Sequence, residues 1–162
     1  MRSNARPPLA WRTTWCLGDT DVVVGISAGG RTRFVLGALD EAERRGSLRI
    51  AIVCNAGSPL GRAADIAIEV DTGPEVIAGS TRLKAGTVQK LVLNMVSTTV
   101  FTRMGRTHRG RMVGVVASNE KLRDRAARIV ADLSGLPLDE ARRRLDEAGG
   151  DVRAALAAVR RP

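Results

Sequence analysis

A glycine-rich loop between residues 25 and 32 carries the side chains best suited to binding an anion. The segment reads GISAGGRT, and it follows an apolar run and precedes an amphipathic stretch. Unpaired backbone N–H groups at a helix start, together with the helix dipole, favour an anion there. Ser27 and Thr32 add hydroxyl donors. Gly29 and Gly30 let the backbone approach a phosphate without a Cβ atom in the way, so the loop predicts phosphate binding.

The same residues also fit a simpler role. A glycine-rich turn in which Thr32 only caps the following helix has the same spacing, and spacing alone does not decide between the two interpretations. The loop lacks the lysine of a P-loop and the GxGxxG spacing of a dinucleotide fold. A nucleotide is therefore disfavoured as the ligand.

A second polar segment, residues 73–86, offers a carboxylate, hydroxyls and cations in the sequence GPEVIAGSTRLKAG. In a functional interpretation, Glu75 accepts hydrogen bonds from sugar hydroxyls, while Ser80 and Lys84 complete a sugar site at the start of a long helix. In the alternative, Glu75 is a surface charge and the remaining polar residues cap that helix. Chemistry alone favours the alternative.

The remaining reactive side chains indicate neither a metal site nor a nucleic-acid interface. His108 is the only histidine and lies in an arginine-rich stretch, residues 103–111, without aromatic residues that could stack on bases. This pattern favours a solvated loop or a subunit contact. Cys16 and Cys54 lack the spacing of a zinc site or a disulfide framework, and Cys54 ends an apolar run as a small buried residue would.

The elements that position these residues alternate between strands and helices. Apolar β-branched runs predict strands at residues 21–26, 49–54 and 64–70, the first of them an interior parallel strand. Helical spacing of Val35, Leu36, Leu39 and Ala42 places a helix between the first two strands, and a long helix follows at residues 83–104. Residues 112–116 form a short extended segment. This order predicts an α/β fold with a parallel sheet, which binds ligands at the carboxyl ends of its strands.

Beyond Asn119 three short helices follow without a strand, at residues 120–133, 138–148 and 151–159. Leu122, Ala126, Ile129, Val130 and Leu133 supply the apolar face of the first, and Asn119 is suited to cap it. A compact three-helix appendage is the simplest interpretation.

Composition limits what this fold can do. The chain has 162 residues, 44% of them hydrophobic and only 2% aromatic, with a net charge of +9. The core must therefore be aliphatic, and a surface that stacks bases on aromatic rings is nearly excluded. No apolar run is long enough to cross a membrane, and no secretory signal is recognisable. The charge comes almost wholly from arginine. We expect a cytoplasmic protein that binds neither nucleic acid nor membrane.

Several motifs resemble one family closely. DVVVGISAGGRT, IAIVCNAGSPL, ADIAIEV, GPEVIAGSTRLKAGTVQKLVLNM and SNEKLRDRA resemble the N-acetylmuramic acid 6-phosphate etherases of the sugar isomerase (SIS) phosphosugar-binding superfamily. The resemblance covers about residues 18–160. It implies a parallel-sheet SIS-type sandwich lacking its first strand and helices, followed by a ubiquitin-associated-like (UBA-like) tail. The implied divisions are a non-family segment at residues 1–17, an SIS domain at 18–117 and the tail at 118–162.

The resemblance also implies a reaction. The etherases cleave the lactyl ether of the phosphosugar to give N-acetylglucosamine 6-phosphate and D-lactate, usually as homodimers without metal or organic cofactor. The phosphosugar would contact Ser27, Gly29, Gly30, Thr32, Glu75, Ser80 and Lys84. The family's acid/base carboxylates lie upstream of the matched segment, so no catalytic residue is identified here. We expect a truncated etherase with weak or absent turnover.

Gly29 stands where the etherases have a serine, and the related glucokinase regulators also have glycine there. The alternative is therefore a non-catalytic sugar-phosphate sensor.

Overall fold

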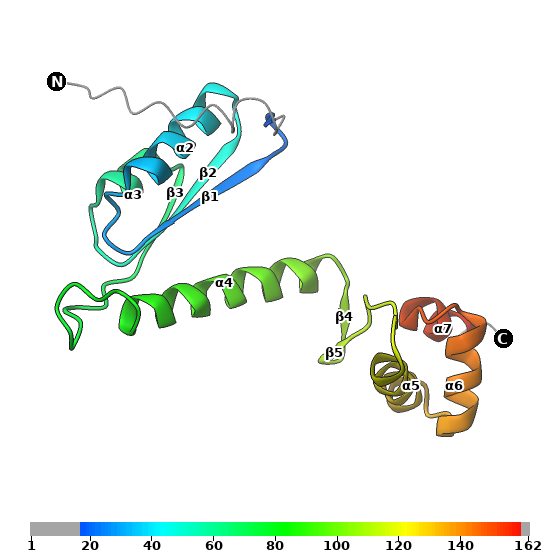
Figure 1. Cartoon of the computed structure of the whole chain (residues 1–162). Coiled ribbons are helices and arrows are strands. Elements are labelled where there is room, and N and C mark those ends of the chain that lie inside the picture. The colour runs from blue at the N-terminus through cyan, green and yellow to red at the C-terminus, as the bar shows by residue number, and fades with distance from the viewer. Residues whose placement is uncertain (1–16, 160–162) are drawn as a thin grey trace. The chain divides into compact units, whose positions relative to one another are not determined.

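The structure is a computed structural model that describes residues 17–159, so the predicted non-family segment lies outside the described residues except for Leu17. In chain order the described elements are β1 (Val22–Ser27), α2 (Arg33–Arg44), β2 (Leu48–Val53), α3 (Pro59–Ala63), β3 (Ile66–Glu69), α4 (Lys84–Arg103), β4 (Thr107–His108), β5 (Arg111–Met112), α5 (Glu120–Ser134), α6 (Leu138–Glu147) and α7 (Val152–Val159). Figure 1 labels them along the chain. Contacts divide the chain into two compact units whose boundary falls between Asn94 and Met95, inside α4. The predicted division at residues 117 and 118 stays a prediction.

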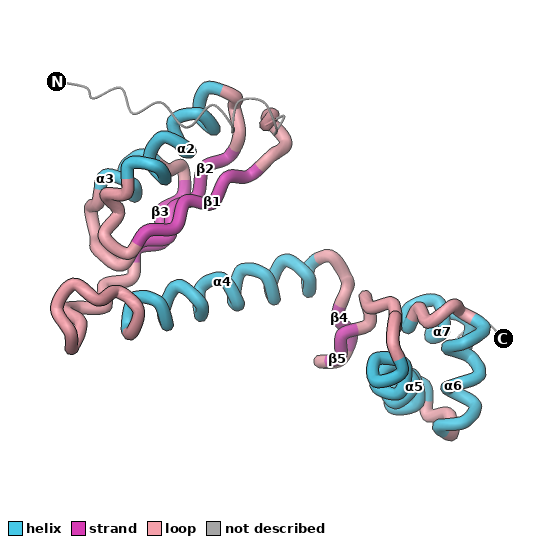
Figure 2. Tube along the Cα trace, in the orientation of Figure 1, coloured by secondary structure: helices cyan, strands magenta, loops and turns pink. Residues whose placement is uncertain are grey.

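Three parallel strands form the sheet of the first unit, in the order β1-β2-β3. Helices α2 and α3 lie on one face of this sheet (Figure 2). The core between them consists of buried aliphatic side chains: Leu39, Ala51, Val53 and Leu60. Leu39 and Ala42 are fully buried at the helical spacing that the sequence shows. The predicted parallel α/β sheet is confirmed.

The predicted interior position of β1 is wrong for the described chain. β1 pairs with β2 on one side only, and no described strand lies on its other side. Val22, Val24 and Ile26 are 52%, 42% and 37% exposed. The run has the composition of an interior strand because it is apolar throughout, but residues 17–159 supply a paired strand along only one of its edges.

A short helix that the sequence analysis did not predict follows β2. In the sequence, Asn55, Gly57, Ser58 and Pro59 are typical of a turn. In the structure the Ser58 side chain accepts a hydrogen bond from the Gly61 N–H (3.2 Å), and Pro59 occupies the first turn of α3. Serine at the cap and proline in the first turn are a helix-start signal as well as a turn signal.

Helix α4 matches the predicted long helix within one residue at each end. The helical spacing of its apolar residues predicts one buried stripe, formed by Leu91, Val92, Met95, Val96 and Val100. Of these five only Val92 is buried. Met95, Val96 and Val100 are 61%, 41% and 47% exposed. No helix among residues 17–159 is long and apolar enough to cross a membrane.

The arginine-rich stretch after α4 forms a two-stranded hairpin, with Thr107 opposite Met112 and His108 opposite Arg111. Of the extended segment predicted at residues 112–116, only Met112 lies in this hairpin, and Val116 forms an isolated bridge with Asp151. Arg111 forms an ion pair with Asp132 of α5 (2.8 Å), and the Arg106 guanidinium lies 5.5 Å from the centre of the Phe101 ring. These arginines are held by contacts within the second unit.

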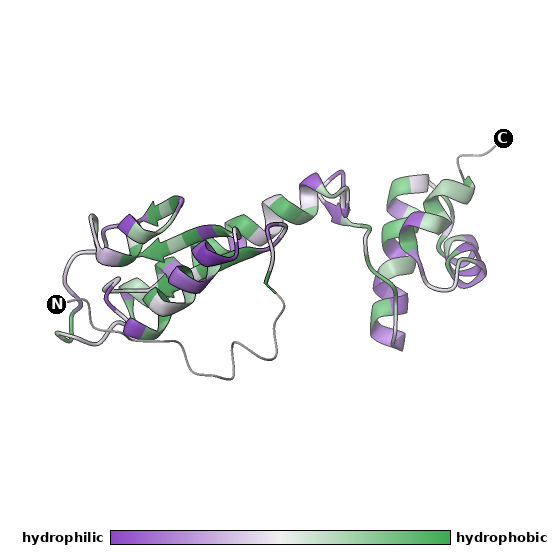
Figure 3. Cartoon of the chain, turned by 90° about the horizontal axis from the view of Figure 1, so that it is seen from above, coloured by the Kyte–Doolittle hydropathy of each residue, from purple (hydrophilic) through white to green (hydrophobic). Residues whose placement is uncertain are grey.

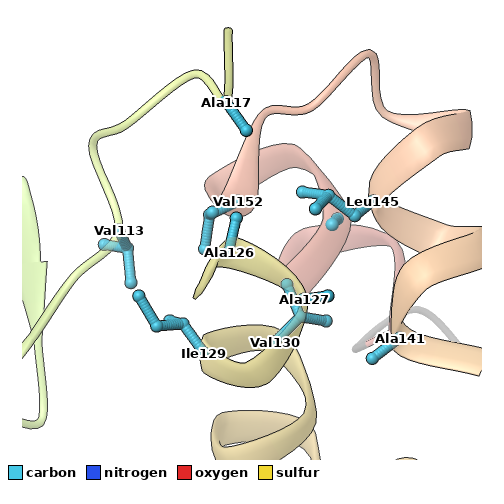
Figure 4. Close-up of a cluster of buried hydrophobic side chains, with 10 residues drawn as sticks. Val113, Ala117, Ala126, Ala127, Ile129, Val130, Ala141, Leu145 and Val152 are labelled. Atoms are coloured by element: carbon cyan, nitrogen blue, oxygen red, sulfur yellow. The ribbon is translucent and has the colours of Figure 1, made fainter. Parts of the chain in front are cut away.

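Helices α5, α6 and α7 pack together around a small aliphatic core, part of which Figure 4 shows. Its members include Ala126, Val130, Leu145 and Val152, each at most 1% exposed. The Asn119 side chain accepts a hydrogen bond from the Leu122 N–H (2.9 Å), so the predicted cap of α5 is confirmed. The three-helix appendage is present as expected, while its likeness to UBA domains stays a prediction.

Candidate phosphate-binding site

The loop from Ser27 to Thr32 connects the carboxyl end of β1 to the start of α2. Ser27 Oγ lies 2.8 Å from Thr32 Oγ1, and the Gly30 N–H donates to Ser27 Oγ (3.2 Å). Thr32 occupies the cap position of α2, but its side chain makes no capping hydrogen bond. Its hydroxyl is instead turned toward Ser27. Two hydroxyls are thereby held side by side at the start of a helix.

The two central glycines of this loop differ in what surrounds them. Gly30 has a φ of +62°, and a Cβ atom there would overlap the Ser58 side chain and lie 3.3 Å from Val53. At Gly29 nothing lies within 4 Å of the position that a Cβ atom would take, and its φ is not in the left-handed region. Gly30 is therefore required by the packing of the loop. Gly29 faces open space that a ligand or a larger side chain can occupy.

The start of α2 has the electrostatic character of an anion site. The first turn contains no acidic residue, so no side-chain carboxylate of that turn offsets the positive end of the helix dipole. Arg31 and Arg33 flank the cap and are exposed. A phosphate placed here would meet helix N–H groups and two hydroxyls, in a segment whose two arginines add positive charge.

Cys54, just beyond β2, connects this loop to the start of α4. Its backbone N–H donates to Ala28 O (3.0 Å), and its thiol lies 3.9 Å from Ala85 O. The residue is 4% exposed, and burial, aided by the charge of Glu75, raises the pKa of the thiol. This agrees with the prediction of a buried small residue. The loop and the start of α4 thus lie at the same edge of the sheet.

The Glu75 side chain caps α4. Its Oε2 accepts from the Lys84 N–H and its Oε1 from the Ala85 N–H, both at 3.0 Å. These backbone hydrogen bonds lower the pKa of the Glu75 carboxyl, and the bond from Ala85 has the largest effect. Each carboxylate oxygen keeps a further lone pair, so capping does not prevent Glu75 from also accepting a sugar hydroxyl. Serine and threonine are common caps, so the sequence points to Ser80 or Thr81 for this role, but the structure gives it to Glu75.

Five of the seven site residues predicted from sequence fall into two hydrogen-bonded groups in the structure. Hydrogen bonds join Ser27, Gly30 and Thr32 in one network and bring Glu75 to the backbone of Lys84 in another. Ser80 is half-buried in the loop before α4, and among the described residues its side chain belongs to neither network. The exposed Lys84 side chain extends toward Gly73.

Two residues that support the loop were not singled out from the sequence. The Asn55 side-chain amide donates to Ala28 O (3.2 Å), and the Ser58 side chain packs against Gly30. Their position in the sequence could have indicated this supporting role, because both follow β2 at the carboxyl edge of the sheet. Residues 17–159 contain no group of three or more His, Cys, Asp or Glu side chains that could hold a metal ion.

Replacing Glu75 by glutamine tests its capping role. Because the folded-state pKa is lowered, the ionised carboxylate stabilises the fold fully above its unfolded pKa, roughly 4.3, and this stabilisation is lost as pH falls through the folded value. Glu75→Gln is therefore expected to lower the midpoint of urea unfolding at pH 7 and to converge with the parent chain in acid. Asp40→Asn, at an exposed position of α2, controls for the lost charge. A variant that is equally destabilised at pH 7 and in acid below the folded-state pKa of Glu75 would argue against a charge-dependent cap.

The fold is a parallel α/β sheet with a loop suited to an anion at the carboxyl end of one strand. A comparison with protein families makes the class specific: the SIS domain matches residues 16–99. This match covers more than half of the 162 residues, and the chain belongs to the SIS domain family.

Curated proteins named N-acetylmuramic acid 6-phosphate etherase are similar to the chain. One from Rubrobacter xylanophilus is 53% identical over 144 residues, which cover 89% of this chain and 48% of that protein. Those of Jannaschia sp. and Symbiobacterium thermophilum are each 52% identical, over 86% of this chain and 44% and 46% of their own lengths. The predicted resemblance is confirmed, and the chain spans less than half the length of these relatives.

Proposed function

We propose that the chain binds a sugar phosphate as the phosphosugar-binding part of an N-acetylmuramic acid 6-phosphate etherase. The observation that carries this proposal is the loop from Ser27 to Thr32, where two hydroxyls 2.8 Å apart flank the start of α2. The names of the similar proteins supply the substrate class. Because those relatives bear the etherase name, the alternative of a non-catalytic sensor is not favoured.

In this proposal the phosphate lies at the start of α2. Backbone N–H groups and the hydroxyls of Ser27 and Thr32 donate to its oxygens, while Gly29 and Gly30 allow close approach. Ser27 is only 8% exposed. Little water therefore contacts its hydroxyl, and little must be displaced when the ligand binds. Glu75, Ser80 and Lys84 complete the site on the sugar side, with Glu75 held in place by its bonds to α4.

Etherase chemistry needs more than this site provides. One group must remove the proton at C2 of the open-chain sugar, and a group must protonate the departing lactate before water adds. No residue of this chain is assigned to that pair. The purified 162-residue protein is expected to bind N-acetylglucosamine 6-phosphate but to release little or no D-lactate from the etherase substrate. Turnover at the rate of a full-length etherase, measured by D-lactate release, would contradict this assignment.

Gly29→Ser restores the hydroxyl that the etherases have at this position. Because nothing lies within 4 Å of the added Cβ and the backbone is not left-handed there, the serine should fit without rearrangement. It is expected to tighten N-acetylglucosamine 6-phosphate binding roughly tenfold, as one hydrogen bond to a charged group would. Calorimetric titration measures this. Gly29→Ala, which adds the Cβ without the hydroxyl, is the matched control, and an equal gain in both variants would exclude the hydroxyl as the cause.

The cellular setting is also part of the proposal. A cytoplasmic homodimer that uses no cofactor follows from the etherase resemblance, and a sugar-phosphate ligand agrees with membership of the SIS family.

A further inference from the structure

The turn between β2 and α3 contacts the loop from Ser27 to Thr32, the phosphate loop, through a backbone carbonyl. Ala28 O accepts two hydrogen bonds, from the Cys54 N–H (3.0 Å) and from the Asn55 side-chain amide (3.2 Å). Two donors occupy both lone pairs of this oxygen, which fixes its direction. The strands β1 and β2, which lead into the two segments, are largely apolar (Figure 3), so the polar contacts at this edge of the sheet come from the loops that follow them.

The direction of this carbonyl and of a second one sets the direction of two backbone N–H groups. Gly30 O accepts a hydrogen bond from the Leu60 N–H (3.0 Å), so it also faces the turn. In a trans peptide the C=O and the N–H of the next residue point in opposite directions, and no peptide bond among residues 17–159 is cis. The N–H groups of Gly29 and Arg31 therefore face away from the turn. Within the described residues neither has a hydrogen-bond acceptor, which leaves both for the oxygens of an anion.

The peptide between Ala28 and Gly29 is the one that glycine makes easy to turn over. A half-turn of this peptide plane would bring a carbonyl oxygen to the side that the Gly29 N–H now faces, and an oxygen there would repel a phosphate. Such a half-turn takes φ of the second residue to positive values, which glycine adopts without strain. The φ of Gly29 is not in the left-handed region, so the plane is in the orientation that presents the N–H. The hydrogen bonds to Ala28 O hold it there.

We propose that Asn55 is a positioning residue for the phosphate site. By holding Ala28 O, its side-chain amide keeps the Gly29 N–H directed at the phosphate. The turn that carries Asn55 has anchors of its own, since Glu69 Oε1 accepts from the Gly57 N–H (3.0 Å). Asn55 is exposed, so its loss should leave the fold and the turn in place. The proposal rests on the phosphate site proposed above, because it needs an anion at the start of α2.

A double-mutant cycle separates positioning from a general structural effect. Asn55→Ala should weaken binding of N-acetylglucosamine 6-phosphate roughly tenfold, as loss of one N–H donor to a charged group would, while the midpoint of urea unfolding stays unchanged. Gly29→Ala alone should leave the affinity unchanged, because Asn55 already holds the peptide plane. With a Cβ atom at position 29 the turned-over peptide is strained, so in that background Asn55→Ala should cost less than about twofold. An equal loss in both backgrounds, or no loss in either, overturns the proposal.

Nuclear magnetic resonance relaxation of the ligand-free chain provides a second measurement that does not depend on affinity. In Asn55→Ala the Gly29 amide should become more mobile than in the parent chain, while the Gly61 amide in α3 should not change. A Gly29 amide that is equally ordered in both proteins overturns the proposal. If the parent chain does not bind the sugar phosphate but Asn55→Ala mobilises Gly29, the phosphate assignment fails while the hold of Asn55 on the loop is confirmed. The two failures are thereby distinguished.

Discussion

Gly30→Ala is expected to destabilise the first unit and to abolish sugar-phosphate binding. The φ of +62° disfavours any residue with a Cβ, and that Cβ would overlap Ser58, whose side chain caps α3. Backbone strain and overlap together should cost about 2–4 kcal/mol of unfolding free energy. The hydroxyl pair of Ser27 and Thr32 is anchored through the same turn, so the binding site should be lost with it.

Urea unfolding followed by circular dichroism measures the stability loss, and calorimetric titration measures binding. Gly29→Ala is the matched control, since it adds the same methyl group one residue earlier with nothing within 4 Å. It should change stability by no more than about 0.5 kcal/mol. Equal stability of the two variants would mean that the loop does not pack against Ser58 as described.

Leu39→Ala should destabilise the protein by about 2–5 kcal/mol, as is usual for a fully buried leucine. Leu39 is 0% exposed and packs in the core that α2 shares with β2 and α3. Its loss leaves a cavity under the helix whose start is proposed to hold the phosphate. Sugar-phosphate affinity should therefore fall as well, because α2 is less firmly held.

The comparison variant is Val76→Ala, which truncates an aliphatic side chain that is 90% exposed. Little change is expected there, within about 0.5 kcal/mol. Similar unfolding midpoints for Leu39→Ala and Val76→Ala would be incompatible with a core between α2 and the sheet.

Periodicity in the sequence predicted the strands and the long helices well, because burial of aliphatic side chains dominates those elements. The strand β2 contains Ala51, Ile52 and Val53, all buried, and α2 buries Leu39 and Ala42 at helical spacing. Helix α3 was missed because Ser58 and Pro59 start turns and helices alike. The predicted interior position of β1 was wrong. An apolar run shows that a strand is suited to burial, but it does not show which residues would lie beside that strand.

The site was predictable only in part. Ser27, Gly30 and Thr32 are close in sequence, so their clustering follows from the local loop. The cap on α4 joins Glu75 to backbone groups nine and ten residues later, and the path of the intervening loop determines that contact. Cys54 was correctly predicted to be a small buried residue. Its contact with Ala85 could not be predicted, because that contact depends on where α4 begins.

The most direct test of the phosphate loop is a titration of the purified chain with N-acetylglucosamine 6-phosphate and, separately, with N-acetylglucosamine. The phosphorylated sugar should bind and raise the unfolding temperature, while the unphosphorylated sugar should do neither. Ser27→Ala should weaken the binding roughly tenfold by removing one donor to the phosphate. Equal responses to the two sugars, or undiminished binding by Ser27→Ala, would contradict a phosphate site at the start of α2.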